Sequence, residues 1–284
     1  MTERIAGLLA GMVGLFMAID FCKGEAMAAE RELQWSGYTW GVKDSGKVQF
    51  GPGPNYWSSD YRNVWVDAAG SLHLKITYRD GTWYSSEIFN METLGFGTYR
   101  FYLESRIDTL DPNVVLGLYT YDTESIDAAD KHYREIDIEF SRWGNPEESN
   151  SWYTVQPHTE IGNVQPFKSE FSGEYSTHSF SWAPEYIRFQ SLHGHYAHPP
   201  HNDYVSHDWL YEGMYVPDSS QEKVDLNLWL FEGKPPQDGK EVEIVIRKFE
   251  FEPFDWAMGL GGKRSLEKGA MLNRNANMLG RVRW

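Results

Sequence analysis

The chain has 284 residues, of which 41% are hydrophobic and 24% are charged, and its formal net charge is -15. This hydrophobic fraction excludes a disordered chain, and the acidic balance would repel phosphate backbones, so we expect no nucleic-acid partner. Aromatic residues make up 15% of the chain, which favours flat and rigid contact surfaces.

The first 28 residues are expected to be a signal peptide that is removed. Arg4 precedes an apolar stretch from Ile5 to Ile19, which is too short to span a bilayer comfortably, and Ala26-Met27-Ala28 offers a cleavage site of small residues. An uncleaved N-terminal anchor is the alternative. The single cysteine, Cys22, lies in this leader. We therefore expect a secreted protein, extracellular or periplasmic, with no disulfide and no membrane span after cleavage.

Residues 29–256 show the pattern of one all-β domain. Apolar and polar residues alternate from Leu72 to Tyr78, from Tyr99 to Leu103 and from Val242 to Ile246, as in half-buried strands. Glycine-containing turns separate the runs, and neither a long amphipathic helix nor a βαβ rhythm is present. This pattern predicts an antiparallel β-sandwich of the jelly-roll type.

The candidate chemistry lies between Tyr133 and Phe140. In an extended strand Glu135, Asp137 and Glu139 point to one face, and the apolar residues between them point to the other. Three carboxylates at steps of about 7 Å repel one another, so their arrangement indicates a site that uses shifted carboxyl pKa values. The alternatives are a solvated acidic strand face or a cation site.

Hydrolysis of a glycosidic bond fits this pattern because it needs two carboxyls, one on each side of the scissile bond. In a flat strand the Cα atoms of Glu135 and Glu139 lie about 13 Å apart. The carboxyls of a retaining pair lie only about 5 to 5.5 Å apart, so the backbone and the side chains would have to close that gap.

At these residues the sequence resembles glycoside hydrolase family 16, the lichenase and laminarinase group, over about residues 35 to 256. The resemblance implies a concanavalin A-like sandwich and a retaining endo-glycosidase that acts as a monomer on β-glucan-like polysaccharides. No cofactor is required, although relatives sometimes carry a structural calcium ion. The segments that carry the resemblance are Glu135–Phe140, Ser86–Ile88, Phe96–Tyr99, His178–Trp182, Ile187–Phe189 and Asn227–Trp229.

The resemblance also implies roles for individual residues. Glu135 corresponds to the nucleophile, Glu139 to the general acid/base, and Asp137 to the residue that orients and tunes them. Six further residues are candidates for sugar binding, by aromatic stacking or by hydrogen bonds to hydroxyls. Core packing, or an ordinary surface hydrogen bond, is the alternative for each of them. They are Glu87, Tyr119, Tyr121, Tyr133, His158 and Trp229.

Two other functions remain open for such a chain. A transglycosylase would pass the glycosyl unit to another sugar, and a carbohydrate-binding sandwich would bind without turnover. The intact pair of Glu135 and Glu139 disfavours the second, because a lectin does not need a perturbed pair of acids.

Two segments outside this scheme carry weaker signals. Five histidines between His193 and His207 offer imidazoles to a metal, but an exposed loop is the simpler interpretation, and catalysis by carboxylates needs no metal. Residues 257–284 form a glycine- and asparagine-rich tail with a formal charge of +5. We expect either a solvated extension or a cationic arm that contacts an acidic surface.

Overall fold

The computed structural model describes residues 31–124 and 132–256. The expected signal peptide and the basic tail lie outside these residues, so the structure does not test their proposed roles. Within the described chain, no helix has the length and apolar character needed to cross a bilayer.

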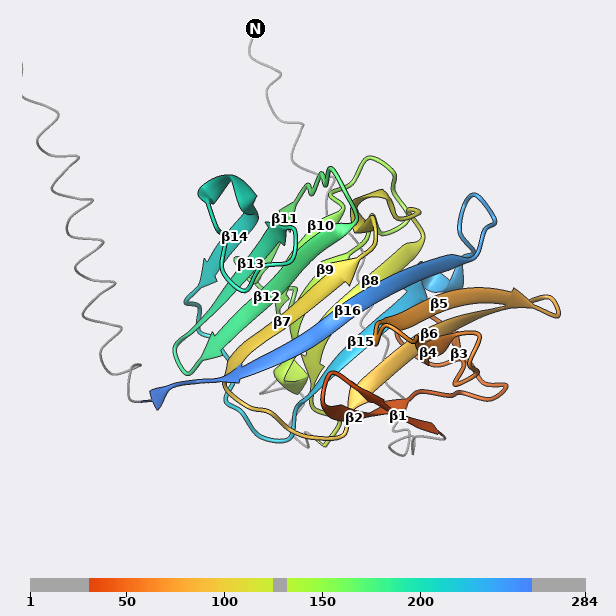
Figure 1. The fold of residues 1–284 in the computed structure, drawn as a ribbon, viewed down its shortest axis with the longest axis horizontal. Coiled ribbons are helices and arrows are strands. Elements are labelled where there is room, and N and C mark those ends of the chain that lie inside the picture. The colour runs from red at the N-terminus through yellow and green to blue at the C-terminus, as the bar shows by residue number, and fades with distance from the viewer. Residues whose placement is uncertain (1–30, 125–131, 257–284) are drawn as a thin grey trace, which may run out of the picture.

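The strands form two layers (Figure 1). The first layer contains the strand that carries Asp137 and Glu139. Its strands follow one another by hydrogen bonding, and β2 and β1 extend it beyond β6. In spatial order they are β11 (Val164–Phe167), β10 (Ser151–Val155), β9 (Ile136–Phe140), β8 (Val114–Tyr121), β15 (Lys223–Leu230), β6 (Thr82–Asn90), β2 (Tyr38–Val42) and β1 (Arg31–Trp35).

The second layer continues from β6 through the β5–β6 hairpin. A short strand, β4 (Val64–Val66), pairs with β5, and β3 (Tyr56–Trp57) is the one described strand that pairs in parallel, with β6. In spatial order the layer contains β5 (Leu72–Arg79), β16 (Val242–Pro253), β7 (Gly97–Glu104), β12 (Tyr175–Ala183), β13 (Tyr186–His193) and β14 (Val205–Tyr211).

Within the described residues, four single turns of 3-10 helix join the strands. The second of these turns leads directly into β9. The turns are η1 (Ile107–Thr109), η2 (His132–Arg134), η3 (Asn202–Tyr204) and η4 (Phe231–Gly233).

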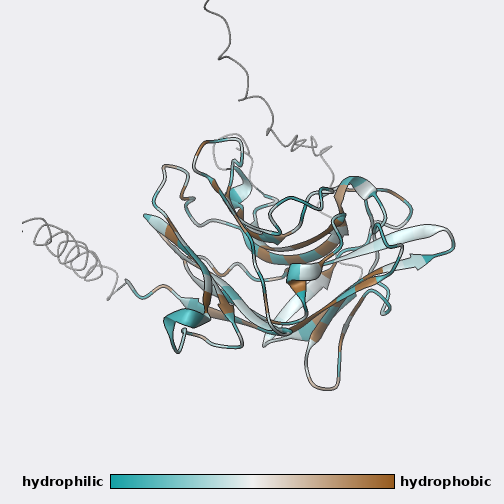
Figure 2. Ribbon diagram, turned by 90° about the horizontal axis from the view of Figure 1, so that it is seen from above, coloured by the Kyte–Doolittle hydropathy of each residue, from teal (hydrophilic) through white to brown (hydrophobic). Residues whose placement is uncertain are grey.

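The core lies between the two layers because each strand turns its apolar side inward. Ile138 on β9 and Leu74 on β5 are fully buried in one cluster, and Tyr153 on β10 stacks on Phe189 on β13 with ring centroids 4.8 Å apart. Hydrophobic and hydrophilic segments alternate along the strands in Figure 2, as a two-layer sandwich requires. The predicted all-β antiparallel sandwich is confirmed.

Candidate active site

The three acids leave β9 on the side away from the core. Ile136, Ile138 and Phe140 are fully buried between the layers, so the alternation places Asp137 and Glu139 on the outer side of the strand. Glu135 precedes the strand, and its carbonyl extends the pairing with β10 by accepting a hydrogen bond from the Gln156 backbone N–H at 3.2 Å. We call this outer side of the first layer the acid face.

The chain enters β9 through a left-handed turn that the sequence did not reveal. His132, Tyr133 and Arg134 have φ values of 45°, 57° and 52°, a conformation that side chains disfavour. Arg134 holds the turn in place with a 2.6 Å ion pair to the buried Asp122, and Thr120 Oγ1 donates a hydrogen bond to the Arg134 carbonyl at 2.8 Å.

The turn corrects one expectation. Strand alternation continued back from Glu135 would place Tyr133 on the acid face, but Tyr133 lies in the turn before the strand. Its ring instead stacks on that of Tyr121, which ends β8, with centroids 5.0 Å apart and planes 14° apart. The two tyrosines therefore form one aromatic surface beside Glu135, whose charge contributes to the raised pKa of Tyr121 after the larger effect of burial.

The register of β8 against β9 places Tyr119 opposite Asp137 and Gly117 opposite Glu139. A Cβ atom on Gly117 would lie 2.5 Å from Asn227 Oδ1, which is too close for any real contact. Glycine therefore keeps the backbone next to Glu139 uncovered and lets Asn227 approach β8.

Asn227 connects two predicted sugar-binding residues. It lies on β15, opposite Gly117 on β8 and opposite Glu87 on β6. Its Nδ2 donates to the Tyr119 hydroxyl at 3.2 Å and more weakly to Glu87 Oε2 at 3.4 Å. Glu87 is buried and forms a 2.8 Å ion pair with Lys43. Glu87 and Tyr119 thus lie on the acid face in one polar network.

Asp225 is a residue of the acid face that sequence reasoning missed. It lies opposite Tyr119, is 8% exposed, and its Oδ1 has no hydrogen-bond partner among the described residues. Burial and the charge of Glu87 raise its pKa well above the usual value. The available signal was the alternation of Asp225, Asn227 and Trp229 with apolar residues along β15.

Gln156 is a second missed residue, and it connects His158 to the acids. Its Nε2 donates to Asp137 Oδ2 at 3.2 Å, and its Oε1 accepts from the backbone N–H of His158 at 2.8 Å. The Nδ1 atom of His158 lies 3.2 Å from the same Oε1, and burial lowers the pKa of the imidazole. His158 therefore reaches the acid face through Gln156, and burial favours the neutral form of its ring.

Trp229 lies at the Glu139 end of the acid face and is mostly buried. It packs with Trp57 and Val115 in a small cluster apart from the main core. The ring of Trp143 is 6.3 Å from that of Trp229 and 6.2 Å from that of Trp152, which pairs with Glu139 across β9 and β10. Trp229 therefore packs within an aromatic cluster, and that same cluster lies where a sugar ring could stack.

Burial and mutual repulsion raise the pKa of all three acids. Burial first, and then the charge of Glu139, raise the pKa of Glu135 to about 8, while a hydrogen bond with Asp137 opposes the increase. Burial and the charge of Glu135 raise the pKa of Asp137 well above its usual value, and burial and the charge of Asp137 do the same for Glu139. The hydrogen bond between the two acids lowers the pKa of Glu135 and raises the pKa of Asp137. Both effects are explained if a protonated Asp137 donates to an ionised Glu135.

The histidines of the loop region lie in separate surroundings. His207 stacks on Phe167 with centroids 4.1 Å apart, and His195 Nε2 lies 2.8 Å from the Leu103 carbonyl. Across residues 31–124 and 132–256, no group of three or more His, Cys, Asp or Glu side chains is arranged to hold a metal ion.

Comparison with solved structures shows the fold. No protein-family model matches the sequence, and no curated protein sequence matches it. A Bacillus licheniformis beta-glucanase is 18% identical, with a TM-score of 0.53 over 76% of this chain and 92% of that one. A Mycobacterium marinum beta-1,3-glucanase is also 18% identical, with a TM-score of 0.53 over 75% and 90%.

A third structure that shares the fold is described as a pseudo-glucanase rather than as a glucanase. It is an immunostimulatory antigen and pseudo beta-1,3-glucanase of Mycobacterium tuberculosis, 16% identical, with a TM-score of 0.56 over 76% of this chain and 91% of that one. The structural resemblance to beta-glucanases that the sequence predicted is confirmed at the level of the fold.

Proposed function

We propose that the protein is a retaining endo-glycosidase of glycoside hydrolase family 16 that cleaves O-glycosidic bonds in β-glucan-like polysaccharides. The observation that carries this proposal is the acid face of β9, where Glu135, Asp137 and Glu139 have raised pKa values and two of them share a hydrogen bond. The glucanases that share the fold support the same reaction class.

In the proposed mechanism, Glu135 attacks the anomeric carbon while Glu139 protonates the leaving oxygen. The raised pKa of Glu139 keeps its proton available near neutral pH. Asp137 donates its hydrogen bond to Glu135 and so favours the ionised nucleophile. The attack leaves the sugar bonded covalently to Glu135. Glu139 then removes a proton from an incoming water, whose oxygen attacks the anomeric carbon and breaks the bond to Glu135, so the sugar leaves with its configuration retained.

The spacing of a flat strand need not apply to this pair. Glu135 precedes β9 and follows three left-handed residues, so the chain turns immediately before it. The charge of Glu139 contributes to the raised pKa of Glu135, which fits two carboxyls that act on one bond.

The sugar would lie over the residues that surround the acids. The stacked rings of Tyr121 and Tyr133 offer an apolar surface beside Glu135, and Trp229 offers part of one at the Glu139 end. Between them, the Tyr119–Asn227–Glu87 network presents donors and acceptors to hydroxyl groups. His158 would contribute through Gln156.

A polysaccharide panel tests the proposal. The secreted protein is incubated with mixed-linkage β-glucan, laminarin, xyloglucan, agar and carrageenan, and the anomer of the first product is read by NMR. We expect cleavage of a β-glucan with retention, and loss of at least about 10³-fold in kcat for Glu135→Ala. Glu212→Gln, which changes an exposed glutamate, is the matched control and should keep full activity. Inversion, or an active Glu135→Ala variant, would overturn the mechanism.

The pseudo beta-1,3-glucanase of the same fold favours a second candidate, a carbohydrate-binding protein without turnover. Binding to a polysaccharide of the panel without any product would support that candidate. A transglycosylase is the remaining alternative, and an added oligosaccharide acceptor that yields longer products would identify it.

We also propose that the protein is secreted as a monomer after loss of its first 28 residues, on the grounds of the leader sequence and the family resemblance. N-terminal sequencing of the protein recovered from the medium or periplasm should begin at residue 29. Light scattering should give the mass of one chain.

A further inference from the structure

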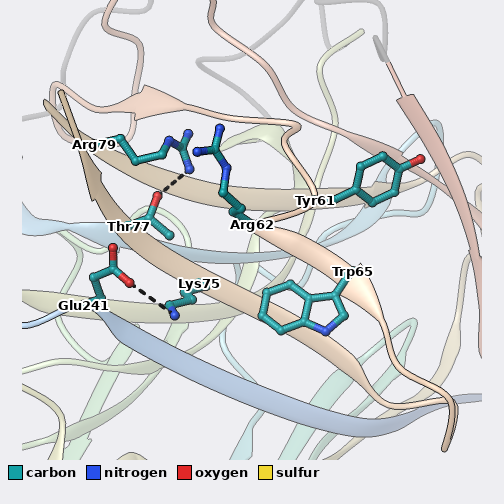
Figure 3. A pocket seen from close by; sticks show the side chains of 7 residues that line it. All are labelled: Tyr61, Arg62, Trp65, Lys75, Thr77, Arg79 and Glu241. Carbon is teal, nitrogen blue, oxygen red and sulfur yellow. Dashed lines mark hydrogen bonds and ion pairs between the residues drawn. The ribbon is translucent and has the colours of Figure 1, made fainter.

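A cavity of about 600 Å³ lies on the outer side of the second layer, beside β4 and β5 (Figure 3). Lys75 and Thr77, which line it, alternate with the core residues Leu74 and Ile76, so the cavity opens away from the acid face. Its volume falls within the range of about 300–1,000 Å³ that small-molecule sites occupy. None of the residues proposed for catalysis lines it.

Two aromatic rings lie at one side of this cavity in Figure 3, those of Tyr61 and Trp65. Tyr61 is 71% exposed, and neither ring belongs to a hydrophobic cluster of the described chain. Trp65 is held by parallel stacking on His73, with centroids 4.5 Å apart, and the Arg31 guanidinium lies 4.2 Å from the centroid of Tyr61. These rings are held in place outside the core, so core packing does not explain them.

Two of the three cations that line the cavity are paired with carboxylates. Lys75 Nζ lies 3.2 Å from Glu241 Oε2, and Arg62 Nη2 lies 2.6 Å from Asp60 Oδ2, a residue beside the lining. The third cation, Arg79, donates to neutral side chains, so each of the three already has partners. Such a surface suits the hydroxyl groups of a neutral ligand better than a phosphate or a sulfate, which would require cations that are not already engaged.

Arg79, which also lines the cavity, has a structural role because it connects two neighbouring side chains. Its Nη1 donates to Thr77 Oγ1 at 2.7 Å, and its Nη2 donates to Ser58 Oγ at 3.1 Å. These bonds hold the floor of the cavity. The exposed rings and the ion pairs are thus the features that a ligand would use.

We propose that this cavity is a second saccharide-binding site, which holds a neutral stretch of polysaccharide on the face opposite the acids. Fixed rings stack on the C–H faces of sugars, and the neighbouring ion pairs bind hydroxyls. The choice of polysaccharide rests on the proposed function. A chain held at two sites is retained more strongly than one held at the acid face alone, so the effect grows with polymer length.

Affinity electrophoresis tests the site directly. The Glu135→Gln protein, which should not cut the polymer, is run in gels that contain mixed-linkage β-glucan or laminarin. Adding Trp65→Ala or Tyr61→Ala to this background should weaken the association constant by about fivefold or more. Tyr175→Ala, which removes a ring that is 56% exposed outside the cavity, is the matched control and should leave it unchanged. Unaltered retention of the Trp65→Ala protein, with its Tm unchanged, would overturn the proposal.

A kinetic comparison separates this site from the proposed activity. In the catalytically intact protein, Trp65→Ala should lower kcat/KM on the polymer and leave kcat/KM on a short oligosaccharide unchanged. Equal losses on both substrates would count against a separate site. A protein that cuts no glycan would contradict the proposed function, but the gel measurement would still decide whether the cavity binds saccharide.

Discussion

Asp137 has two neighbours that affect its proton in opposite ways. Gln156 donates to it and lowers its pKa, whereas burial and the adjacent Glu135 raise the pKa by more. The result is a carboxyl that keeps its proton and can donate it in a hydrogen bond to Glu135. A neutral Asp137 thereby lowers the pKa of Glu135, although burial and the charge of Glu139 still hold that pKa at about 8.

The pH dependence of activity should report this arrangement. The hydrogen bond from Asp137 lowers the pKa of Glu135, so Asp137→Ala removes that effect and the pKa of Glu135 rises. The proposed nucleophile then takes up its proton at higher pH, and the acidic limb of kcat/KM should move to higher pH. We expect a loss of about tenfold or more at the optimum, ~1.4 kcal/mol. An acidic limb that stays in place would contradict the role given to Asp137.

The same burial should reduce stability at neutral and alkaline pH. The pKa of Glu135 is about 8 in the folded protein and near 4.5 in the unfolded chain, so the folded state favours the proton. Its stabilising contribution is complete below pH 4.5 and is lost as the pH rises through 8. Glu135→Gln stays neutral and should raise Tm at pH 8 by a few degrees, ~2–4 °C for each kcal/mol.

Two comparisons test this stability prediction. At pH 4 the Glu135→Gln and native proteins should melt together, because Glu135 is then protonated in both states. Glu212→Gln, at an exposed position, should show no gain at either pH. A gain that is equal at pH 4 and pH 8 would indicate better packing rather than removal of a buried charge.

At the level of elements, the sequence predicted which face a side chain occupies wherever the alternation of a single strand decides that face. Strand alternation placed Asp137 and Glu139 on one side of β9, because a half-buried strand admits only one register of its apolar residues. The position of Tyr133 depends instead on a turn that contacts from Asp122 and Thr120 stabilise. The residues of the left-handed turn therefore could not predict its conformation by themselves.

The missed residues have the same explanation. Asp225 and Gln156 reach the acid face only through the pairing of β15 with β8 and of β10 with β9. The sequence of either strand alone predicts a polar residue, and the long-range register decides what that residue faces. The site could thus be predicted along β9 but not across the sheet.

The close approach of β8 and β15 gives a prediction at this scale. Gly117→Ala would place a methyl group 2.5 Å from Asn227 Oδ1 and displace the amide that bonds Tyr119 and Glu87. We expect a loss of about 1–3 kcal/mol in stability and a higher KM with kcat less affected. Gly173→Ala has no atom within 4 Å of the new Cβ and should alter neither. A normal KM for Gly117→Ala would show that Asn227 is not a substrate contact.

At the scale of the whole molecule, one sandwich presents two outer faces of different character. The first layer presents acids with raised pKa values, and the second presents rings beside ion pairs. Each face depends on the same core, because every strand that contributes outer residues also buries apolar ones between the layers. We therefore expect that the proposed cleavage and the proposed retention of a polymer can be changed separately, by substitutions on opposite sides of one fold.

The relation of the basic tail to this sandwich is the last testable feature. Residues 29–256 carry a formal charge of -19 and residues 257–284 one of +5, so contact between them would be electrostatically favourable. The buried core cluster of the described residues runs from Leu33 to Phe249. We therefore expect that a chain ending at residue 256 melts within about 1 °C of the longer one at both low and high salt. A lower Tm that recovers in high salt would show instead that the tail binds its own acidic domain, because screening removes such an interaction.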